Sequence, residues 1–172
     1  MSFVQGFPAE AAPRARVLIL GSMPGRASLA AAQYYAHPRN VFWPLLGTIL
    51  GFDPALPYVR RLQGLRERGV ALWDVLQSCE RQGSLDAAID PRSQRPNDFG
   101  ALFAAQPELR AVLCNGATAH RLFVRTVLPT LAPGGTAPFA VHRLPSTSPA
   151  HAGLPWSDKL AAWRAVLAPL CG

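Results

Sequence analysis

Two short apolar runs of the same form, each ending at a glycine, most constrain the fold of this chain. They are RVLILG at residues 16–21 and AVLCNG at residues 111–116. Both are rich in branched aliphatic side chains and too short for a typical helix, so both predict buried strands. Two further candidates are GVALWDVL at 69–76 and FAVHRLPS at 139–146, of which the second is halted by Pro145. The sequence therefore contains four candidate strands.

Helix-like patterns lie between these strands and after the last one. Their residues are 40–52, 57–69, 96–109, 117–129 and 156–170. The first pattern is apolar on all sides, which indicates a buried helix, and the second is amphipathic and ends in a glycine. Strands that alternate with helices are typical of an α/β domain with a mainly parallel central sheet.

The length of the chain favours one domain, because 172 residues are enough for a core but few for two domains. We expect residues 1–172 to form a single domain in which residues 1–14 are a loosely ordered N-terminal segment. The segments 90–98 and 131–138 have the composition of loops. No run of about 18 apolar residues occurs and the start of the chain lacks a secretory pattern, so we expect neither a membrane span nor a signal peptide.

The three cysteines, Cys79, Cys114 and Cys171, are far apart and odd in number. Their spacing suits neither a zinc site nor an iron–sulfur cluster. We expect buried or free thiols in a reducing compartment, which is the cytoplasm.

The net charge of +7 comes with a bias, since 16 of the 17 basic residues are arginines. A surplus of guanidinium groups attracts polyanions and suits bidentate contacts with phosphate. Arginine bias can also reflect the base composition of a genome, so charge alone leaves nucleic-acid binding open.

Three unusual turns follow candidate strands. They are residues 21–28 (GSMPGRAS), 115–117 (NGA) and 145–151 (PSTSPAH). In open parallel sheets, ligands bind beyond the carboxyl ends of the strands. We therefore expect these turns to converge along one rim. Each turn alone could equally be a tight connection that satisfies its own backbone.

The segment YYAHPRNVFW at residues 34–43 combines aromatic rings with an arginine and an asparagine. A ring face can stack on a nucleobase, and a carboxamide can orient water or read a base edge. Asn40 could instead cap a helix that begins at Val41, or the helix could begin at Pro38 and be kinked by Pro44. Of the aromatic residues, Phe42 and Trp43 are expected in the core.

Together, LGSMPG, YYAHPRNVFW, NGATA and LPSTSPAHA resemble the uracil-DNA glycosylase superfamily, and most of all its hypoxanthine-DNA (deoxyinosine) glycosylases. The resemblance extends from about Arg16 to the terminal helix. It implies a three-layer α/β/α sandwich with a mainly parallel four-stranded sheet. It also implies hydrolysis of the N-glycosidic bond of a base flipped out of DNA, without a metal or an organic cofactor.

The resemblance also implies roles for single residues in the base pocket. The superfamily usually places Asp or Asn two residues after the first glycine, where this chain has Met23. The deoxyinosine branch shows the same loss and uses an asparagine in the position of Asn40, which becomes the catalytic candidate. Tyr35 is the candidate for stacking on the base, and Asn115 for reading its edge. The turn residues Ser22 and Met23 complete the implied base-binding set.

The loop near the carboxyl end corresponds to the second motif of the superfamily. Uracil-specific members begin it with a histidine that supports charge on the departing base, whereas this chain has Leu144. Stabilisation of the leaving base is therefore unassigned, with His37, His142 and His151 as substitutes, and no pair of carboxylates stands out in the matched segments. Contacts with the DNA backbone are implied for Pro145, Ser146, Thr147, Ser148 and His151.

The sequence therefore predicts a monomeric DNA-deoxyinosine glycosylase of base excision repair in the bacterial cytoplasm. Its partner would be double- or single-stranded DNA with a deaminated base: hypoxanthine, or else uracil or xanthine. Alternatives are a uracil- or mismatch-directed glycosylase of the same superfamily, an inactive DNA-binding domain, and a hydrolase of free nucleosides.

Overall fold

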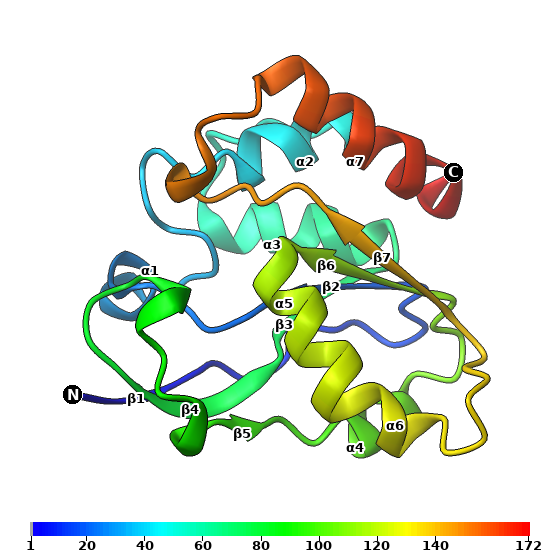
Figure 1. Ribbon diagram of the computed structural model, residues 1–172. Coiled ribbons are helices and arrows are strands. Elements are labelled where there is room, and N and C mark those ends of the chain that lie inside the picture. The colour runs from blue at the N-terminus through cyan, green and yellow to red at the C-terminus, as the bar shows by residue number, and fades with distance from the viewer. Residues whose placement is uncertain (1) are drawn as a thin grey trace.

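The four predicted strands form one parallel sheet in the computed structural model, which describes residues 2–172 (Figure 1). Its strand order is β3-β2-β6-β7, and every neighbouring pair is parallel. The strands are β2 (Val17–Gly21), β3 (Val70–Asp74), β6 (Ala111–Asn115) and β7 (Ala140–Leu144). The predicted mainly parallel four-stranded sheet is confirmed.

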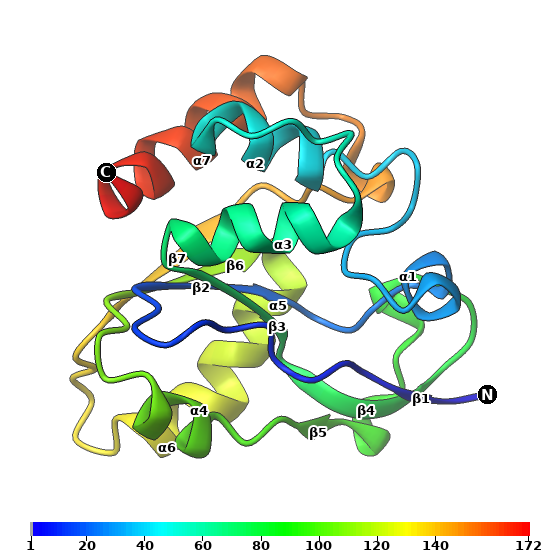
Figure 2. The same ribbon diagram turned by 180° about the vertical axis from the view of Figure 1, so that it is seen from behind.

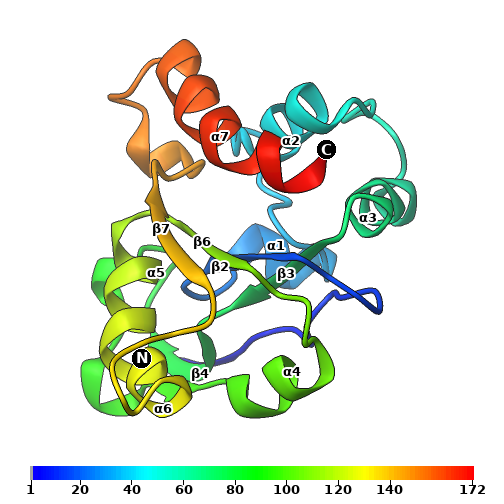
Figure 3. The same cartoon turned by 90° about the vertical axis from the view of Figure 1, so that its right-hand side faces the viewer.

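Helices cover both faces of this sheet, as the edge-on view in Figure 3 shows. The side chains of β2 alternate between two hydrophobic clusters: Val17 and Ile19 pack in one, and Leu18 and Leu20 pack in the other. Each cluster is closed by a helical layer, so the three-layer sandwich is confirmed. No helix within residues 2–172 combines the length and the apolar character that a bilayer crossing requires. One layer holds α2 (Phe42–Leu50), α3 (Tyr58–Glu67) and α7 (Trp156–Cys171), and the other holds α4 (Phe99–Ala105), α5 (Ala117–Leu122) and α6 (Leu128–Leu131).

At the start of helix α2, an asparagine side chain accepts a hydrogen bond from a backbone N–H that has no acceptor within the helix. The Asn40 Oδ1 accepts a hydrogen bond of 3.0 Å from the backbone N–H of Phe42, the first residue of the helix. A start at Pro38 is therefore wrong. Pro44 is the third residue of the helix. The backbone N–H groups of the first turn have no partner within the helix, so a proline there removes no helical hydrogen bond and causes no break. The helix ends at Leu50, and the C-cap residue Gly51 has a φ of +78°, which is accessible to glycine at little cost.

The predicted helix over residues 117–129 is interrupted. Between α5 and α6, Phe123–Val127 form a π-helical turn. Pro129 lacks an N–H and cannot bond to the carbonyl four residues earlier, which favours a local widening of the helix. The hydroxyl of Thr126 donates to the Leu122 carbonyl at 2.7 Å and satisfies one backbone acceptor in the widened turn.

A second sheet was not predicted. It is antiparallel, has the order β1-β4-β5, and lies along one edge of the molecule in Figure 2. The expected strand over 69–76 divides at Val75, where the chain leaves the parallel sheet. The 90–98 segment contains a strand as well as a loop. The three strands are β1 (Ser2–Gln5), β4 (Leu76–Arg81) and β5 (Arg95–Pro96).

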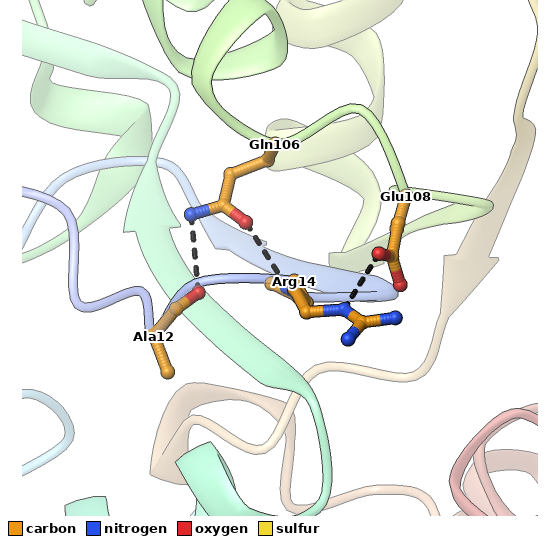
Figure 4. A network of polar contacts seen from close by, with 5 residues as sticks. Ala12, Arg14, Gln106 and Glu108 are labelled. Carbon is orange, nitrogen blue, oxygen red and sulfur yellow. Dashed lines mark hydrogen bonds and ion pairs between the residues drawn. The ribbon is translucent and has the colours of Figure 1, made fainter.

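The expectation of a loosely ordered N-terminal segment is wrong for residues 2–14, while Met1 lies outside the described residues. Residues 2–5 of this segment form β1, which pairs with β4. The close-up in Figure 4 shows that residues 12–15 are held against the end of α4. The Gln106 carboxamide donates to the Ala12 carbonyl at 3.1 Å and accepts from the Ala15 N–H at 3.0 Å. Arg14 pairs with Glu108 at 2.7 Å. These partners lie more than 90 residues away in the chain, so local composition could not reveal them.

All three cysteines are buried free thiols, as expected. Burial raises the pKa of the Cys114 thiol to about 12, so it stays protonated and unreactive at neutral pH. Within residues 2–172, no group of three or more His, Cys, Asp or Glu side chains is placed to hold a metal ion.

Candidate active site

A cavity of about 660 Å³ opens at the carboxyl ends of the parallel strands. The three turns predicted to converge all line it, together with the 34–40 segment. Convergence along one rim is therefore confirmed. Two contributions were not predicted, namely Asp74 at the end of β3 and the 84–87 segment, which runs into the 3₁₀ turn Asp86–Ala88.

Hydrogen bonds around Thr147 tie three of these segments together. The Asn115 carboxamide donates to the Thr147 Oγ1 at 2.9 Å and accepts from the Thr147 N–H at 2.9 Å. The Thr147 carbonyl accepts from the N–H of Val41 at 3.1 Å, next to Asn40. The end of β6, the start of α2 and the second-motif loop are therefore held in a fixed relation.

A glycine allows the closest approach among these segments. Gly116 has a φ of +101°, and a Cβ there would lie 3.0 Å from the Cβ of Ser146. Its N–H donates to the carbonyl of Leu144 at 2.9 Å. A side chain at this position would both strain the backbone and push the loop away from β6.

Asn40 lines the cavity and is half-buried. Because its Oδ1 accepts from Phe42, its Nδ2 faces away from the helix, and no hydrogen bond to a residue in the described chain uses that nitrogen. Val41 is the N-cap residue of α2, so the expected cap by Asn40 is replaced by a bond from Asn40, one residue earlier, to the first helical N–H. The same side chain is the candidate catalytic group. The helix fixes the carboxamide while its donor side stays available to a ligand or to water.

Tyr35 is held in a strained position at the cavity wall. Its φ of +55° is uncommon for a residue with a Cβ, and the next N–H, of Ala36, is anchored by the Ser28 hydroxyl at 3.2 Å. The ring stacks on that of Phe42, with centroids 3.8 Å apart and 18° between planes. Burial, with the nearby Asp74 as a smaller cause, raises the pKa of Tyr35 above its usual range, so its hydroxyl stays protonated.

Two residues of the first turn, Ser22 and Met23, differ in their contacts at the cavity. Ser22 lines the cavity, and its hydroxyl donates to the Asp86 Oδ1 at 2.6 Å. Met23 also lies at the cavity, but it is only 6% exposed and packs in the hydrophobic core. The predicted base contacts of both residues stay predictions.

Only part of the second-motif loop lines the cavity. Pro145 does not line the cavity; its carbonyl accepts from the Trp163 Nε1 at 2.9 Å and anchors the loop to α7. Leu144 is buried at the end of β7. Of the histidines named as substitutes, His142 lies in β7 away from the cavity. The motif residues at the cavity are Ser146, Thr147, Ser148 and His151, and His37 joins them from the 34–40 segment.

Two carboxyl groups at the cavity were missed. Asp74 is 4% exposed, and its Oδ2 is buried without a hydrogen-bond partner in residues 2–172. Burial, and secondly the neighbouring Asp86, raise the pKa of Asp74 to about 7, against an opposing effect of Arg81. Burial also raises the pKa of Asp86, and the Ser22 hydroxyl opposes this. The predicted strand over 69–76 placed Asp74 inside a strand, whereas β3 ends at Asp74, so no pattern in the sequence indicated its place at the cavity.

Arg81 was also missed, and its hydrogen bonds hold two of the segments that line the cavity. It is 1% exposed, with its guanidinium donating to the Pro24 carbonyl at 2.5 Å and to the Gly83 carbonyl at 3.0 Å. It therefore joins the first turn to the segment that carries Asp86. Its place in the antiparallel strand β4 has no signature in the sequence.

Asn115→Ala is expected to destabilise the protein by about 1–2 kcal/mol, because two partly buried hydrogen bonds to Thr147 are lost. Thr147→Val removes only one of them and should cost less. Urea unfolding of both single variants and the double variant measures the coupling between the two side chains. Additive effects would show that the Asn115–Thr147 pair does not hold the loop.

Comparisons with known proteins agree with this geometry. The family model described as the Uracil DNA glycosylase superfamily matches residues 8–168. Two proteins named hypoxanthine DNA glycosylase, from Methanosarcina barkeri and Methanosarcina acetivorans, are 42% and 37% identical to this chain over 113 residues. Each alignment covers 65% of this chain and 70% of the relative.

A solved structure is similar over almost the whole length. It is a solution NMR structure of a protein from Methanosarcina acetivorans, provisionally described as a uracil DNA glycosylase. The TM-score is 0.81 at 32% sequence identity, and the alignment covers 98% of this chain and 99% of the other. The chain therefore belongs to the uracil DNA glycosylase superfamily and is a DNA glycosylase.

Proposed function

We propose that this protein releases hypoxanthine from DNA by hydrolysing the N-glycosidic bond of deoxyinosine, which leaves an abasic site for base excision repair. The observation that carries the proposal is that Asn40, Tyr35 and Ser146 line one cavity. Its volume of about 660 Å³ lies in the usual range of small-ligand sites, roughly 300–1,000 Å³. The names of the two sequence relatives support hypoxanthine as the base.

The target bond is inaccessible inside a duplex, so the nucleotide must leave the base stack before it reacts. The Tyr35 ring lines the cavity and is backed by the buried Phe42 ring, so it offers a rigid aromatic wall for the extruded base. Such stacking contributes about 1–3 kcal/mol per base. Hypoxanthine opposite thymine pairs poorly, which lowers the cost of extrusion and contributes to selectivity.

Hydrolysis then requires water at C1′ while the sugar gains oxocarbenium character. We assign the orientation of that water to the Asn40 carboxamide, and its bond to the Phe42 N–H supports the assignment because it fixes the side chain at the cavity. A carboxamide is a weak base, so most of the acceleration must come from geometry and electrostatics. The substrate's own phosphates favour the developing sugar cation.

DNA binding should depend strongly on salt, and residues at the cavity should contribute to that dependence. Arg26 and Arg39 are exposed residues that line the cavity, so they are placed to contact phosphates. Replacing either by alanine is expected to reduce the slope of log K against log salt concentration by about 1. Arg110→Ala is the matched control, because Arg110 is exposed before the start of β6, at the opposite end of the sheet. Fluorescence anisotropy with a labelled duplex measures the slopes. Equal slopes for all three variants would contradict binding at this face.

One assay separates the candidate functions. Duplexes carrying hypoxanthine, uracil, xanthine or only normal bases are incubated with the protein, and abasic sites are then cleaved with alkali. Cleavage at hypoxanthine is the expected result. Cleavage only at uracil would favour the uracil-directed alternative, which the provisional description of the similar NMR structure supports. Binding without cleavage would indicate an inactive DNA-binding domain, and hydrolysis of free inosine alone would indicate a nucleoside hydrolase.

A further inference from the structure

The Asp74 carboxyl lies at the cavity, but neither the sequence motifs nor the proposed water-orienting role of Asn40 uses it. It ends β3 and faces Gly21, the last residue of β2. A Cβ at Gly21 would collide with the Asp74 Oδ1 and lie 3.4 Å from the Tyr35 Oη. A glycine is therefore required where these two polar groups meet above the strand end.

Asp74 and Asn40 reach the cavity from the ends of different strands of the sheet. Strands β3 and β7 are the outer strands of the sheet, three strand spacings or roughly 14 Å apart. Asp74 belongs to β3, whereas the segment of Asn40 is tied to Thr147, just beyond β7. With Asn40 beside the sugar, the base of a bound nucleotide extends toward the strand end that holds Asp74.

The surroundings of Asp74 favour its neutral form. The buried Oδ2 has no donor in residues 2–172 to stabilise a negative charge. The charged and titratable groups that act on Asp74 or respond to it are Asp86, Arg81, Tyr34 and Tyr35. Burial is the main reason that the pKa of Asp74 is raised to about 7, Asp86 adds to the rise, and Arg81 opposes it. The two tyrosines stay neutral, because burial raises the pKa of each above its usual range.

We infer that Asp74 is the general acid that protonates the departing purine, and so supplies the leaving-group stabilisation that Leu144 cannot provide. The inference rests on the proposed function. The Asp74 O–H proton passes to a ring nitrogen of hypoxanthine, and the N9–C1′ bond breaks with its electron pair moving into the purine. The oxygen of water adds to C1′ and loses one proton to solvent, and solvent returns a proton to the Asp74 carboxylate after the purine has left.

The test is the pH dependence of single-turnover hypoxanthine release, measured between about pH 5 and pH 9. In the native protein the rate should fall about tenfold per pH unit above roughly pH 7, because the acid form is then lost. Asp74→Asn keeps the shape but has no proton to give. It should be slower by about 100-fold at pH 6, and its rate should no longer fall with rising pH.

Asp53→Asn is the matched control, because Asp53 is exposed, lies outside the cavity, and an asparagine there can still accept from the Ala55 N–H. It should keep both the native rate and the native profile. The affinity of the Asp74→Asn protein for a duplex with a non-hydrolysable 2′-fluoro deoxyinosine shows whether its binding site is intact. This affinity should stay within about threefold of the native value.

Three results would overturn the role of Asp74. They are a native rate for Asp74→Asn, a slowed variant that keeps the alkaline fall, and a native protein whose rate does not fall above roughly pH 7. The third result needs no variant, so it decides the question even if Asp74→Asn fails to fold. A native protein that releases no hypoxanthine at any pH would instead overturn the proposed function itself.

Discussion

Asn40→Ala is expected to slow hypoxanthine release by at least about 100-fold, while affinity for hypoxanthine-containing DNA changes by no more than about threefold. Loss of one preorganised polar group at a reacting centre typically costs about 10²–10³ in rate. The carboxamide is positioned by the Phe42 N–H and lines the cavity, while the Phe42 ring that backs Tyr35 is also held by its packing in the core. Single-turnover kinetics and duplex binding, measured on the same preparation, give the two quantities.

The same variant also removes the hydrogen bond from the first N–H of α2 to Asn40, which by itself should cost about 1 kcal/mol of stability. Asn40→Ser separates the two roles, because a serine hydroxyl can accept from the Phe42 N–H but provides no carboxamide. We expect the serine variant to unfold close to the native midpoint and to be as slow as the alanine variant. Native turnover by Asn40→Ser would leave Asn40 with only a structural role at the start of α2.

Arg81→Met is expected to lower the free energy of unfolding by about 3 kcal/mol or more. The substitution leaves the carbonyls of Pro24 and Gly83 without their buried donor. It also removes the cation that lowers the pKa of Asp74 and Asp86, so unpaired carboxylates become more costly. The loss should therefore be larger at pH 8, where more of these carboxyls are ionised, than at pH 6.

Urea denaturation at the two pH values measures this effect. Arg125→Met is the matched control, because Arg125 is exposed on the π-helical turn, and it should change stability by less than about 0.5 kcal/mol. A loss below about 1 kcal/mol for Arg81→Met, equal at both pH values, would show that Arg81 does not brace the cavity.

Much of the site could be predicted because its parts are local in the sequence. Glycine after an apolar run marks the end of a strand, and the carboxyl ends of parallel strands lie at one edge of a sheet. These two rules place the turns after β2, β6 and β7 together, and the structure confirms it. From the sequence, Asn40 could either stabilise the start of a helix or act in catalysis. In the structure its side chain bonds to the Phe42 N–H and also lines the cavity, so the geometry permits both roles.

The missed groups depend on partners that are distant in the chain. Asp74 looks like an ordinary strand residue until its pairing with Gly21 places the carboxyl at the cavity. Arg81 has the appearance of a solvated charge, but the turn of the chain at Val75 directs β4 behind the first loop and buries it. The Asn115 amide also has its acceptor and donor engaged by Thr147, which lies 32 residues away.

The amino-acid sequence by itself determined the four strands of the parallel sheet, the turns at their ends and the superfamily, because these depend on short-range patterns of apolar, glycine and proline residues. Only the tertiary structure decided which polar side chains lose their water and which keep a partner. Desolvation and hydrogen-bond satisfaction are properties of the packed surroundings. For this reason the two cavity carboxyls and the arginine behind them could be recognised only in the folded molecule.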